Sequence, residues 1–157
     1  MKVKDPGERV GYLIWQLSQA YAQRMEQALR PLKLTQAQFS ALVRLSLDGT
    51  LSSAELARRC GVTAQSMGTA LRDLVERGLV ERRAHPTHGK IVEMSVTAAG
   101  VELAQRGEAA VEPCEQEALE PFLPQEREQV RAHLQRMLGT LNPRALGPAG
   151  DLLHDGT

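Results

Sequence analysis

Aromatic residues and cysteines are scarce in this sequence, and neither sign of charge is in excess. Phe, Trp and Tyr make up 3% of the 157 residues, and Cys60 and Cys114 are the two cysteines. Two cysteines are too few for a disulfide framework, so none is expected. The 19 basic and 19 acidic side chains cancel, and such a balance at first argues against binding to nucleic acid.

Long apolar runs are absent as well. No run approaches the roughly 18 residues that a membrane-spanning helix needs, and the charged residues 1–6 have no apolar segment of a signal peptide beside them. We therefore expect a cytoplasmic protein that has no membrane partner. The 42% of hydrophobic and 24% of charged residues exclude disordered and collagen-like chains, and they fit one compact domain.

The zero net charge conceals an uneven distribution along the chain. Residues 1–51 carry 7 basic and 4 acidic side chains, and residues 52–100 carry 7 and 5. Residues 101–157 carry 5 basic and 10 acidic side chains. Two mildly basic segments are thus cancelled by an acidic final third, so the balance excludes little about any single face of the protein.

Apolar spacing and capping residues predict two helices in the first part of the chain. Apolar residues three and four positions apart predict a helix over 9–30, which Pro31 ends. Thr35 and Gln38 have the spacing of a capping box, in which each side chain satisfies an amide of the other residue. This box predicts a second helix over 36–47.

Two shorter helices separated by a tight glycine turn come next. A capping box that begins at Ser52 opens the first of them, and Gly61 closes it. Thr63 caps the second, which extends over 63–77 and stops at Gly78. This spacing predicts a helix-turn-helix.

The hydrophobic period changes after the second of these helices. Residues 90–96 alternate between apolar and polar side chains and predict a strand, with residues 79–85 as its partner. The sequence Pro-Thr-His-Gly at 86–89 supplies the turn of a hairpin. The fold class that we predict is mainly α with a small β-hairpin wing, a winged helix-turn-helix.

The last part of the chain predicts two more helices and a tail. Thr97 caps a long helix, and Pro113 should bend or break that helix because it removes an amide donor. A final helix is expected from about 125 to 139. Residues 142–157 show no periodicity and are expected to form a tail.

The helix over 63–77 has one face suited to the major groove of DNA. Its apolar residues gather on one side, and Gln65, Thr69 and Arg72 lie opposite with Ser66 beside them. Gln can pair with adenine, Arg with guanine, and Thr can touch a thymine methyl group or a phosphate. Gly68 costs about 0.5–1 kcal/mol relative to Ala inside a helix, a cost that close approach to DNA would explain.

An ordinary solvated helix face is the alternative interpretation, and neighbouring residues argue against it. The candidates for phosphate contacts are Ser53 and Thr63 at helix N-termini, the pair Arg82 and Arg83, and His88 and Lys90 at the hairpin tip. Helix N-termini and basic side chains are the groups that position a protein on the phosphate backbone. Their gathering around one face favours DNA binding.

Residues 34–100 carry a specific combination of motifs without gaps. They are Leu34-Thr35 through Gln38-Phe39, ELARRCGVTAQSMGTALRDLVERGLVERR from Glu55 to Arg83, HPTHGK from His85 to Lys90, and Val96-Thr97 with Gly100. This combination resembles the MarR family of bacterial transcriptional regulators. The segments on either side are similar to the family only in pattern and length.

The resemblance implies an obligate homodimer that binds a pseudo-palindromic operator and is often released by a small ligand or an oxidant. It divides the chain into an N-terminal dimerisation helix (1–34), a winged helix-turn-helix DNA-binding domain (35–99), C-terminal dimerisation helices (100–141) and a tail (142–157). Matching positions place Thr63, Gln65, Ser66, Thr69 and Arg72 in the major groove and Lys90 in the minor groove.

Three positions depart from the family pattern. The family usually has Asp at the position of His88 and Arg at that of Lys90, and Thr69 often has a basic counterpart. Lys lacks the planar fork of Arg and fits a narrow minor groove less well. We therefore expect weaker or less selective contacts from the wing, and a contribution of His88 that grows as the pH falls.

The sequence offers little support for metal binding, redox sensing or catalysis. His85 and His88 share a turn, but no further ligand stands at a zinc spacing, so no metal is expected. Cys60 is expected to be a buried structural thiol, and glutamates flank Cys114, which makes it a poor redox sensor. No motif of an enzyme is present, so neither catalysis nor a cofactor is expected.

In the family that these motifs resemble, the ligand crevice lies between the dimerisation helices and the winged domain. Trp15, Phe39 and Arg44 are the candidates to line it, and packing within the dimer core is the alternative role for Trp15. The sequence as a whole predicts a dimeric transcriptional repressor. A protein-interaction module that has kept the fold without operator specificity is the alternative.

Overall fold

The structure, a computed structural model, describes residues 5–147. Its elements in chain order are η1 (Pro6–Glu8), α1 (Val10–Leu29), η2 (Arg30–Leu32), α2 (Gln36–Asp48), β1 (Leu51–Ser52), α3 (Ser53–Cys60), α4 (Ala64–Glu76), β2 (Val80–Ala84), β3 (Val92–Val96), α5 (Ala98–Leu119), α6 (Pro124–Leu141) and η3 (Pro143–Leu146). Within the described range no helix combines the length and the apolar character that crossing a membrane requires.

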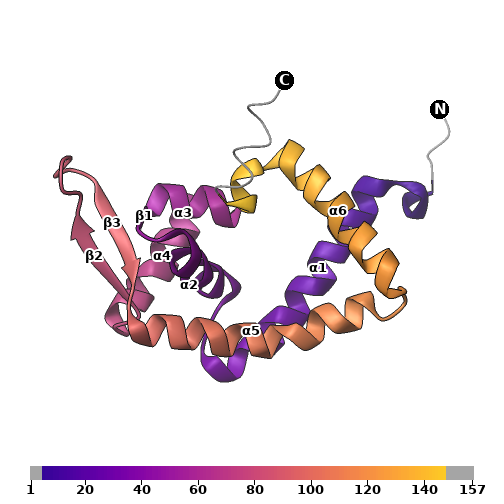
Figure 1. Cartoon of the computed structure of the whole chain (residues 1–157), viewed down its shortest axis with the longest axis horizontal. Coiled ribbons are helices and arrows are strands. Elements are labelled where there is room, and N and C mark those ends of the chain that lie inside the picture. Colours follow the sequence, from indigo (N-terminus) through magenta and orange to yellow (C-terminus); the bar gives the residue numbers. More distant parts are fainter. Residues whose placement is uncertain (1–4, 148–157) are drawn as a thin grey trace.

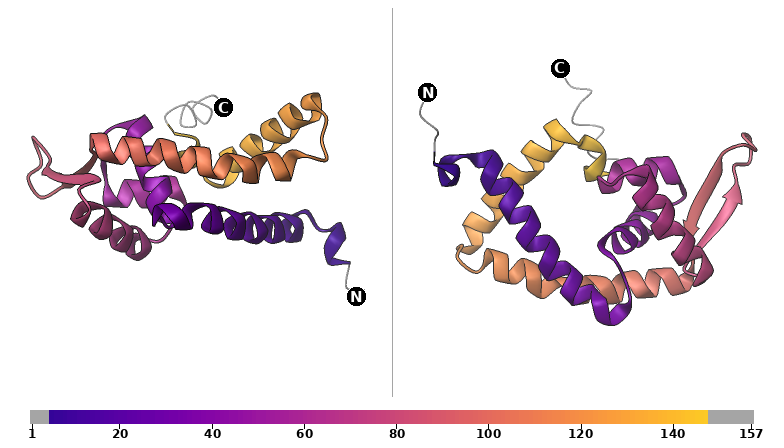
Figure 2. Two further views of the ribbon diagram at one scale, coloured as in Figure 1. Left: turned by 90° about the horizontal axis from the view of Figure 1, so that it is seen from below. Right: turned by 180° about the vertical axis from the view of Figure 1, so that it is seen from behind.

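Helices α2, α3 and α4 and the small sheet form one body at one end of the molecule, which we call the winged body (Figure 1). Helix α5 leads away from it, α1 packs against α5, and α6 returns toward α3 (Figures 1 and 2). The predicted fold class is therefore confirmed. The side chains that fill the core of the winged body are Leu42, Leu45, Leu56, Met67, Leu71, Leu74 and Val80.

Local capping fixes where the helices of the winged body begin. The Gln38 amide donates to Thr35 Oγ1 at 3.2 Å and the Thr35 amide donates to Gln38 Oε1 at 2.9 Å, so the predicted capping box at the start of α2 is confirmed. At the start of α3, the Glu55 amide donates to Ser52 Oγ at 3.2 Å. The Glu55 carboxylate does not complete this second box, because it instead accepts hydrogen bonds from arginines.

The sheet has three antiparallel strands in the order β1-β3-β2. The predicted hairpin is present, with Val80 opposite Val96 and Ala84 opposite Val92. Strand β1, which the sequence did not predict, pairs Leu51 with Met94. A strand of two residues is too short to show an alternating pattern, and only its partner in space defines it.

Glycine at position 100 lets α5 start directly against the winged body. Thr97 caps this helix, since the Gly100 amide donates to Thr97 Oγ1 at 3.1 Å. A Cβ atom on Gly100 would lie 2.2 Å from the carbonyl oxygen of Leu79, so a larger residue would collide with backbone. The Thr-x-x-Gly pattern therefore combines a cap with a close backbone contact.

One expectation for the end of the chain is corrected. Helix α5 continues through Pro113 without a break, and Pro113 is exposed together with Ala109, so the carbonyl that loses its donor can bond to water. Part of the expected tail is ordered, because η3 packs on α3 and the Asn142 side-chain amide donates to the Arg58 carbonyl at 3.2 Å. Residues 148–157 of that tail lie outside the described residues.

Candidate nucleic-acid interface and adjoining cavity

A tight turn sets α4 at an angle to α3 and presents it on the surface. Gly61 has φ of +65°, a left-handed conformation that favours glycine, and the Val62 amide donates to the Ala57 carbonyl at 3.0 Å. Thr63 then caps α4 by accepting a hydrogen bond of 3.1 Å from the Ser66 amide. The sequence expectation for both ends of this turn is confirmed.

Helix α4 has one buried face and one exposed face. Met67, Ala70, Leu71 and Leu74 are buried against the helices before it. The residues predicted to read DNA are all exposed: Thr63, Gln65, Ser66, Thr69 and Arg72. Gly68 has open space where a Cβ atom would stand, so nothing in the described chain requires glycine there. The exposed face therefore has the polar side chains and the backbone access that DNA reading needs.

A short chain of hydrogen bonds orders the middle of this face. The Thr69 hydroxyl donates to the Gln65 carbonyl at 3.1 Å, and Arg72 Nη2 donates to Thr69 Oγ1 at 3.2 Å. The proton of Thr69 is thereby used within the helix, and its methyl group remains available for apolar contact. Arg72 is thereby linked to Thr69 on the same face.

Gln38 and Asp73 join α2 to this helix, a link that the sequence did not predict. Gln38 is buried, and its Nε2 donates to Asp73 Oδ2 at 2.7 Å. Arg77 Nη1 also donates to Asp73 Oδ2, at 3.2 Å. Asp73 therefore fixes α4 against α2.

The hairpin projects from the winged body as the predicted wing (Figure 1). His85 organises its turn, since His85 Nδ1 accepts hydrogen bonds of 3.2 Å from the amides of Thr87 and His88. His85 Nε2 lies 3.4 Å from Glu93 Oε1, so both ring nitrogens are engaged. His88 and Lys90 are exposed at the tip, as a contact with DNA requires.

Arg82 and Arg83, which are adjacent in sequence, lie on opposite faces of the sheet. Both are exposed on β2, but successive strand residues point to opposite faces of a sheet. On one face of the sheet, Arg83 Nη2 pairs with Glu81 Oε2 at 2.8 Å. Arg82 belongs to the other face, and the strand register places it opposite the buried Met94. The two arginine side chains therefore leave the wing from opposite faces of the sheet.

The two serines at the start of α3, Ser52 and Ser53, occupy different positions in the helix. Ser52 is the capping residue, and Ser53 is the first residue of the helix. Ser53 is partly exposed, so its hydroxyl and the free amides of the first turn are close together on the surface. This position remains compatible with a phosphate contact.

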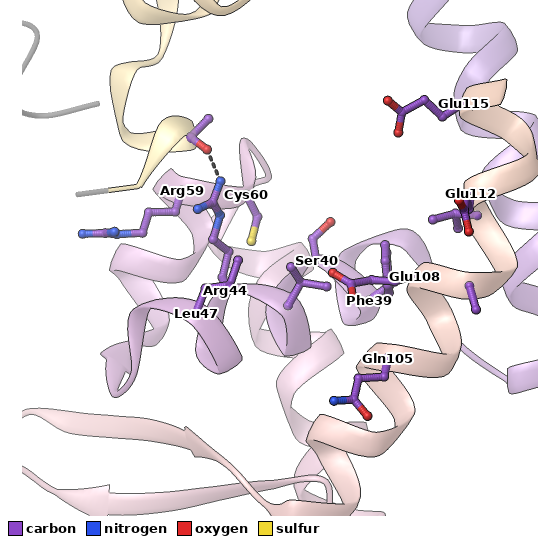
Figure 3. Close-up of a pocket in the computed structure, with 14 residues that line it drawn as sticks. Phe39, Ser40, Arg44, Leu47, Arg59, Cys60, Gln105, Glu108, Glu112 and Glu115 are labelled. Atoms are coloured by element: carbon purple, nitrogen blue, oxygen red, sulfur yellow. Dashed lines mark hydrogen bonds between the residues drawn. The ribbon is translucent and has the colours of Figure 1, made fainter. Parts of the chain in front are cut away.

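A cavity of about 780 Å³ lies between α2, α3 and α5. Phe39 and Arg44 are among the residues that line it, and Figure 3 shows these two side chains on α2 together with Glu108, Glu112 and Glu115 on α5. Phe39 packs on Gly107, where a Cβ atom would stand 2.6 Å from the phenyl ring. Trp15 is not among the lining residues, because it lies on the exposed half of α1 beside Tyr12.

Two arginines and a cysteine line the α2 and α3 side of the cavity. Arg59 Nη1 pairs with Asp48 Oδ2 at 3.0 Å, and Arg44 Nη1 lies 3.7 Å from the same oxygen. Arg44 also donates to the carbonyl of Ala145, the bond drawn in Figure 3. Burial raises the pKa of the Cys60 thiol to about 11, so this thiol is protonated at neutral pH and is a poor nucleophile.

A helix-turn-helix followed by a β-hairpin wing defines a winged helix-turn-helix DNA-binding protein. A sequence model of the MarR family matches residues 32–91. The HTH-type transcriptional repressor Rv2887 of Mycobacterium tuberculosis is 40% identical over 120 residues, which are 76% of this chain and 86% of the relative. The chain belongs to the MarR family, and it is a DNA-binding transcriptional regulator.

Solved structures agree with this assignment over most of the chain. A probable transcriptional regulator from Pseudomonas aeruginosa has a TM-score of 0.75 at 30% identity, and the match covers 85% of this chain and 99% of that one. Rv2887 in complex with p-aminosalicylic acid has a TM-score of 0.69 at 34% identity, covering 82% and 98%. The similarity therefore includes the flanking helices, which showed only a weak resemblance in sequence.

Proposed function

We propose that this protein is a homodimeric repressor that occupies a pseudo-palindromic operator and responds to a small molecule. The observation that carries the DNA-reading part is the exposed face of α4, where Gln65, Thr69 and Arg72 share one side of a capped helix. Its buried face is anchored by the core, so the exposed face is held rigidly. Rigid presentation is what base-specific contacts in the major groove require.

The proposal divides the surface into base-reading and backbone-binding residues. Gln65, Thr69 and Arg72 select bases, and Ser66 lies beside them on the same exposed face. The residues proposed to position the protein on phosphates or in the minor groove are Ser53, Thr63, Arg82, Arg83, His88 and Lys90. Contacts of the second kind fix register and orientation but carry little sequence information.

Exposed apolar side chains on α1 and α6 support a homodimer. The exposed fraction is 64% for Val10 and 58% for Leu17 on α1, and 48% for Leu134 and 79% for Leu141 on α6. Contiguous apolar surfaces of this kind mark interfaces in soluble proteins. We assign residues 1–34 and 100–141 to dimerisation, and a two-fold dimer would present two copies of α4 to two half-sites of an operator.

The cavity beside α2 supports a response to a small molecule. It lies between the winged body and helix α5, which leads to the proposed dimer helices. A ligand that binds one relative arrangement of the winged body and α5 better than another shifts the population toward that arrangement. The distance between the two α4 helices of the dimer changes with it. The relative Rv2887 has been solved with p-aminosalicylic acid. We propose that this protein acts in the cytoplasm, on promoter DNA, and has no catalytic role.

A footprint on the promoter next to the protein's own gene tests this function. Protection of a palindromic sequence by the full chain is the expected result. No protection at low salt would overturn the proposal and favour a protein-interaction module on the same fold. Repeating the footprint with candidate ligands tests the response to a small molecule. At least one ligand is expected to abolish the protection.

The variant Arg72→Ala tests the assignment of the reading face. Its affinity for the operator should fall by about 1–3 kcal/mol, as expected for one lost base contact, while its affinity for random DNA changes less. Arg106→Ala removes the same charge from α5, outside the proposed DNA face, and serves as the control. Equal weakening of Arg72→Ala on both DNAs would assign Arg72 to backbone contacts instead.

A further inference from the structure

We propose that the cavity between α2 and α5 takes a cationic amphiphile, meaning an apolar or aromatic molecule that carries an ammonium or amidinium group. This inference names the chemical class of the effector and rests on the proposed ligand response. It follows from three features of the cavity wall: an apolar floor, two arginines that are already paired, and a row of glutamates that is not.

The floor of the cavity is apolar and in part uncovered. Phe39, Val43, Leu47 and Val111 line it, and Leu47 is 71% exposed. The cavity volume of about 780 Å³ is within the usual range for sites that bind small organic molecules. An aromatic or aliphatic body placed here would remove apolar surface from water, so the floor favours an apolar part in the ligand.

The two arginines of the wall are engaged with partners of their own. Arg59 pairs with Asp48 at 3.0 Å and with Glu55 Oε1 at 3.0 Å. Arg44 lies 3.7 Å from Asp48 and donates to the carbonyl of Ala145. The Asp48 and Arg59 side chains are only 5% and 12% exposed, so these pairs are well shielded from water. A ligand carboxylate would therefore share either guanidinium group with a partner that is already in place.

The opposite wall, on α5, carries Glu108, Glu112 and Glu115, which we call the glutamate row. Their spacing of four and three residues places them on one face of the helix, where Figure 3 shows them along the cavity. Among residues 5–147 none of the three forms an ion pair, and Glu112 Oε1 accepts only a hydrogen bond of 3.3 Å from Gln116. Like charges at this spacing destabilise a helix, and a bound cation would relieve that repulsion.

Within the described chain, the carboxylates of the wall that have no ion-pair partner therefore lie on α5, whereas both of its arginines already have acidic partners. Arg58 and Arg144 add positive charge around Glu55, but neither of them lines the cavity. The structure thus assigns the preferred ligand a positive group directed at α5 and an apolar body against α2. This preference is opposite in sign to the acid bound in the solved complex of Rv2887.

Two probes with the same ring and opposite charge test the inference. Naphthylmethylammonium and naphthoate are titrated into the full chain by calorimetry, without DNA. The ammonium probe should bind about tenfold tighter than the carboxylate, a difference that a few partly exposed charge contacts can supply. In the double variant Glu112→Gln and Glu115→Gln the preference should shrink to about twofold or less, whereas Glu102→Gln, on the same helix but outside the cavity, should leave it unchanged.

Equal binding of the two probes, tighter binding of naphthoate, or no binding of either would overturn the inference. A preference for the ammonium probe that persists in the double variant would also overturn it, because the preference would then arise elsewhere. Far-ultraviolet circular dichroism and the unfolding midpoint confirm that each variant is folded. Operator binding is measured on the same samples without a probe, so failure of the ligand assignment is distinguished from failure of the proposed function.

Discussion

Gln38 of α2 and Asp73 of α4 are joined by a hydrogen bond of 2.7 Å from Gln38 Nε2 to Asp73 Oδ2. Through its Oε1 the same glutamine accepts a hydrogen bond from the Thr35 amide, so one side chain both caps α2 and joins it to α4, the proposed DNA-reading helix. Because Gln38 is buried, neither bond can be replaced easily by water. The orientation of α4 therefore depends on a residue that does not touch the proposed DNA face.

The variant Gln38→Ala should lower the free energy of unfolding by about 1–3 kcal/mol, because it removes the side chain that caps α2 and the hydrogen-bond donor to Asp73. Urea unfolding measures this loss. Gln36→Ala changes an exposed glutamine on the same helix and should change stability little. Equal effects of the two variants would show that the bond to Asp73 contributes nothing beyond helix propensity.

Local signals explain what the sequence could predict. The ends of α2, α3 and α4 are set by Thr35, Gly61 and Thr63, whose preferences act within a few residues along the chain. Strand β1 and the ordered η3 could not be predicted, because their partners, β3 and α3, are distant in sequence. A short segment with distant partners has no periodicity of its own.

The candidate site likewise combines features that the sequence predicted with features that depend on how the helices pack. Helical periodicity identified the exposed residues of α4, and the motif resemblance placed Phe39 and Arg44 at the cavity. The bond from Gln38 to Asp73 and the glutamate row opposite the arginines depend on how α2 packs against α4 and α5. Trp15 was assigned to the cavity by analogy, and in the described chain it lies instead on the apolar surface of α1.

The variant Gly68→Ala should separate stability from DNA binding. No atom of neighbouring elements lies within 4 Å of the added Cβ, so replacing glycine inside α4 should raise stability by roughly 0.5–1 kcal/mol. Operator affinity should fall, because the methyl group would occupy the space where the helix backbone approaches DNA. Thermal unfolding and fluorescence anisotropy measure the two effects. Unchanged affinity in the stabilised variant would show that DNA does not approach this part of α4.

Lys90 at the exposed wing tip should contribute one charge contact with DNA. Its replacement in Lys90→Ala should reduce the slope of log affinity against log salt by about one unit, since one fewer counterion is released. Lys90→Arg keeps the charge and supplies a planar fork suited to a narrow minor groove, so it should keep the slope and bind at least as tightly. The same slope in Lys90→Ala as in the unchanged protein would place the wing outside the interface.

Glu55 should make stability depend on pH in the acid range. Partial burial alone would raise the pKa of Glu55, but hydrogen bonds from Arg58 and Arg59 and the charge of Arg144 outweigh burial and lower the pKa below its ordinary 4.5. A carboxylate with a lowered pKa stabilises the fold at neutral pH, and that contribution is lost as the pH falls through the lowered value.

The variant Glu55→Gln should therefore be less stable than the unchanged protein at pH 7, by about 1–3 kcal/mol for the lost charged hydrogen bonds. The difference should shrink as the pH falls below 4.5, because protonation removes the same charge from the unchanged protein. Urea unfolding between pH 7 and pH 3 measures both curves. Glu128→Gln breaks an exposed pair with Arg131 and should follow the curve of the unchanged protein, since such pairs contribute little. A constant gap between the Glu55→Gln curve and that of the unchanged protein would mean that Glu55 acts through packing rather than through its charge.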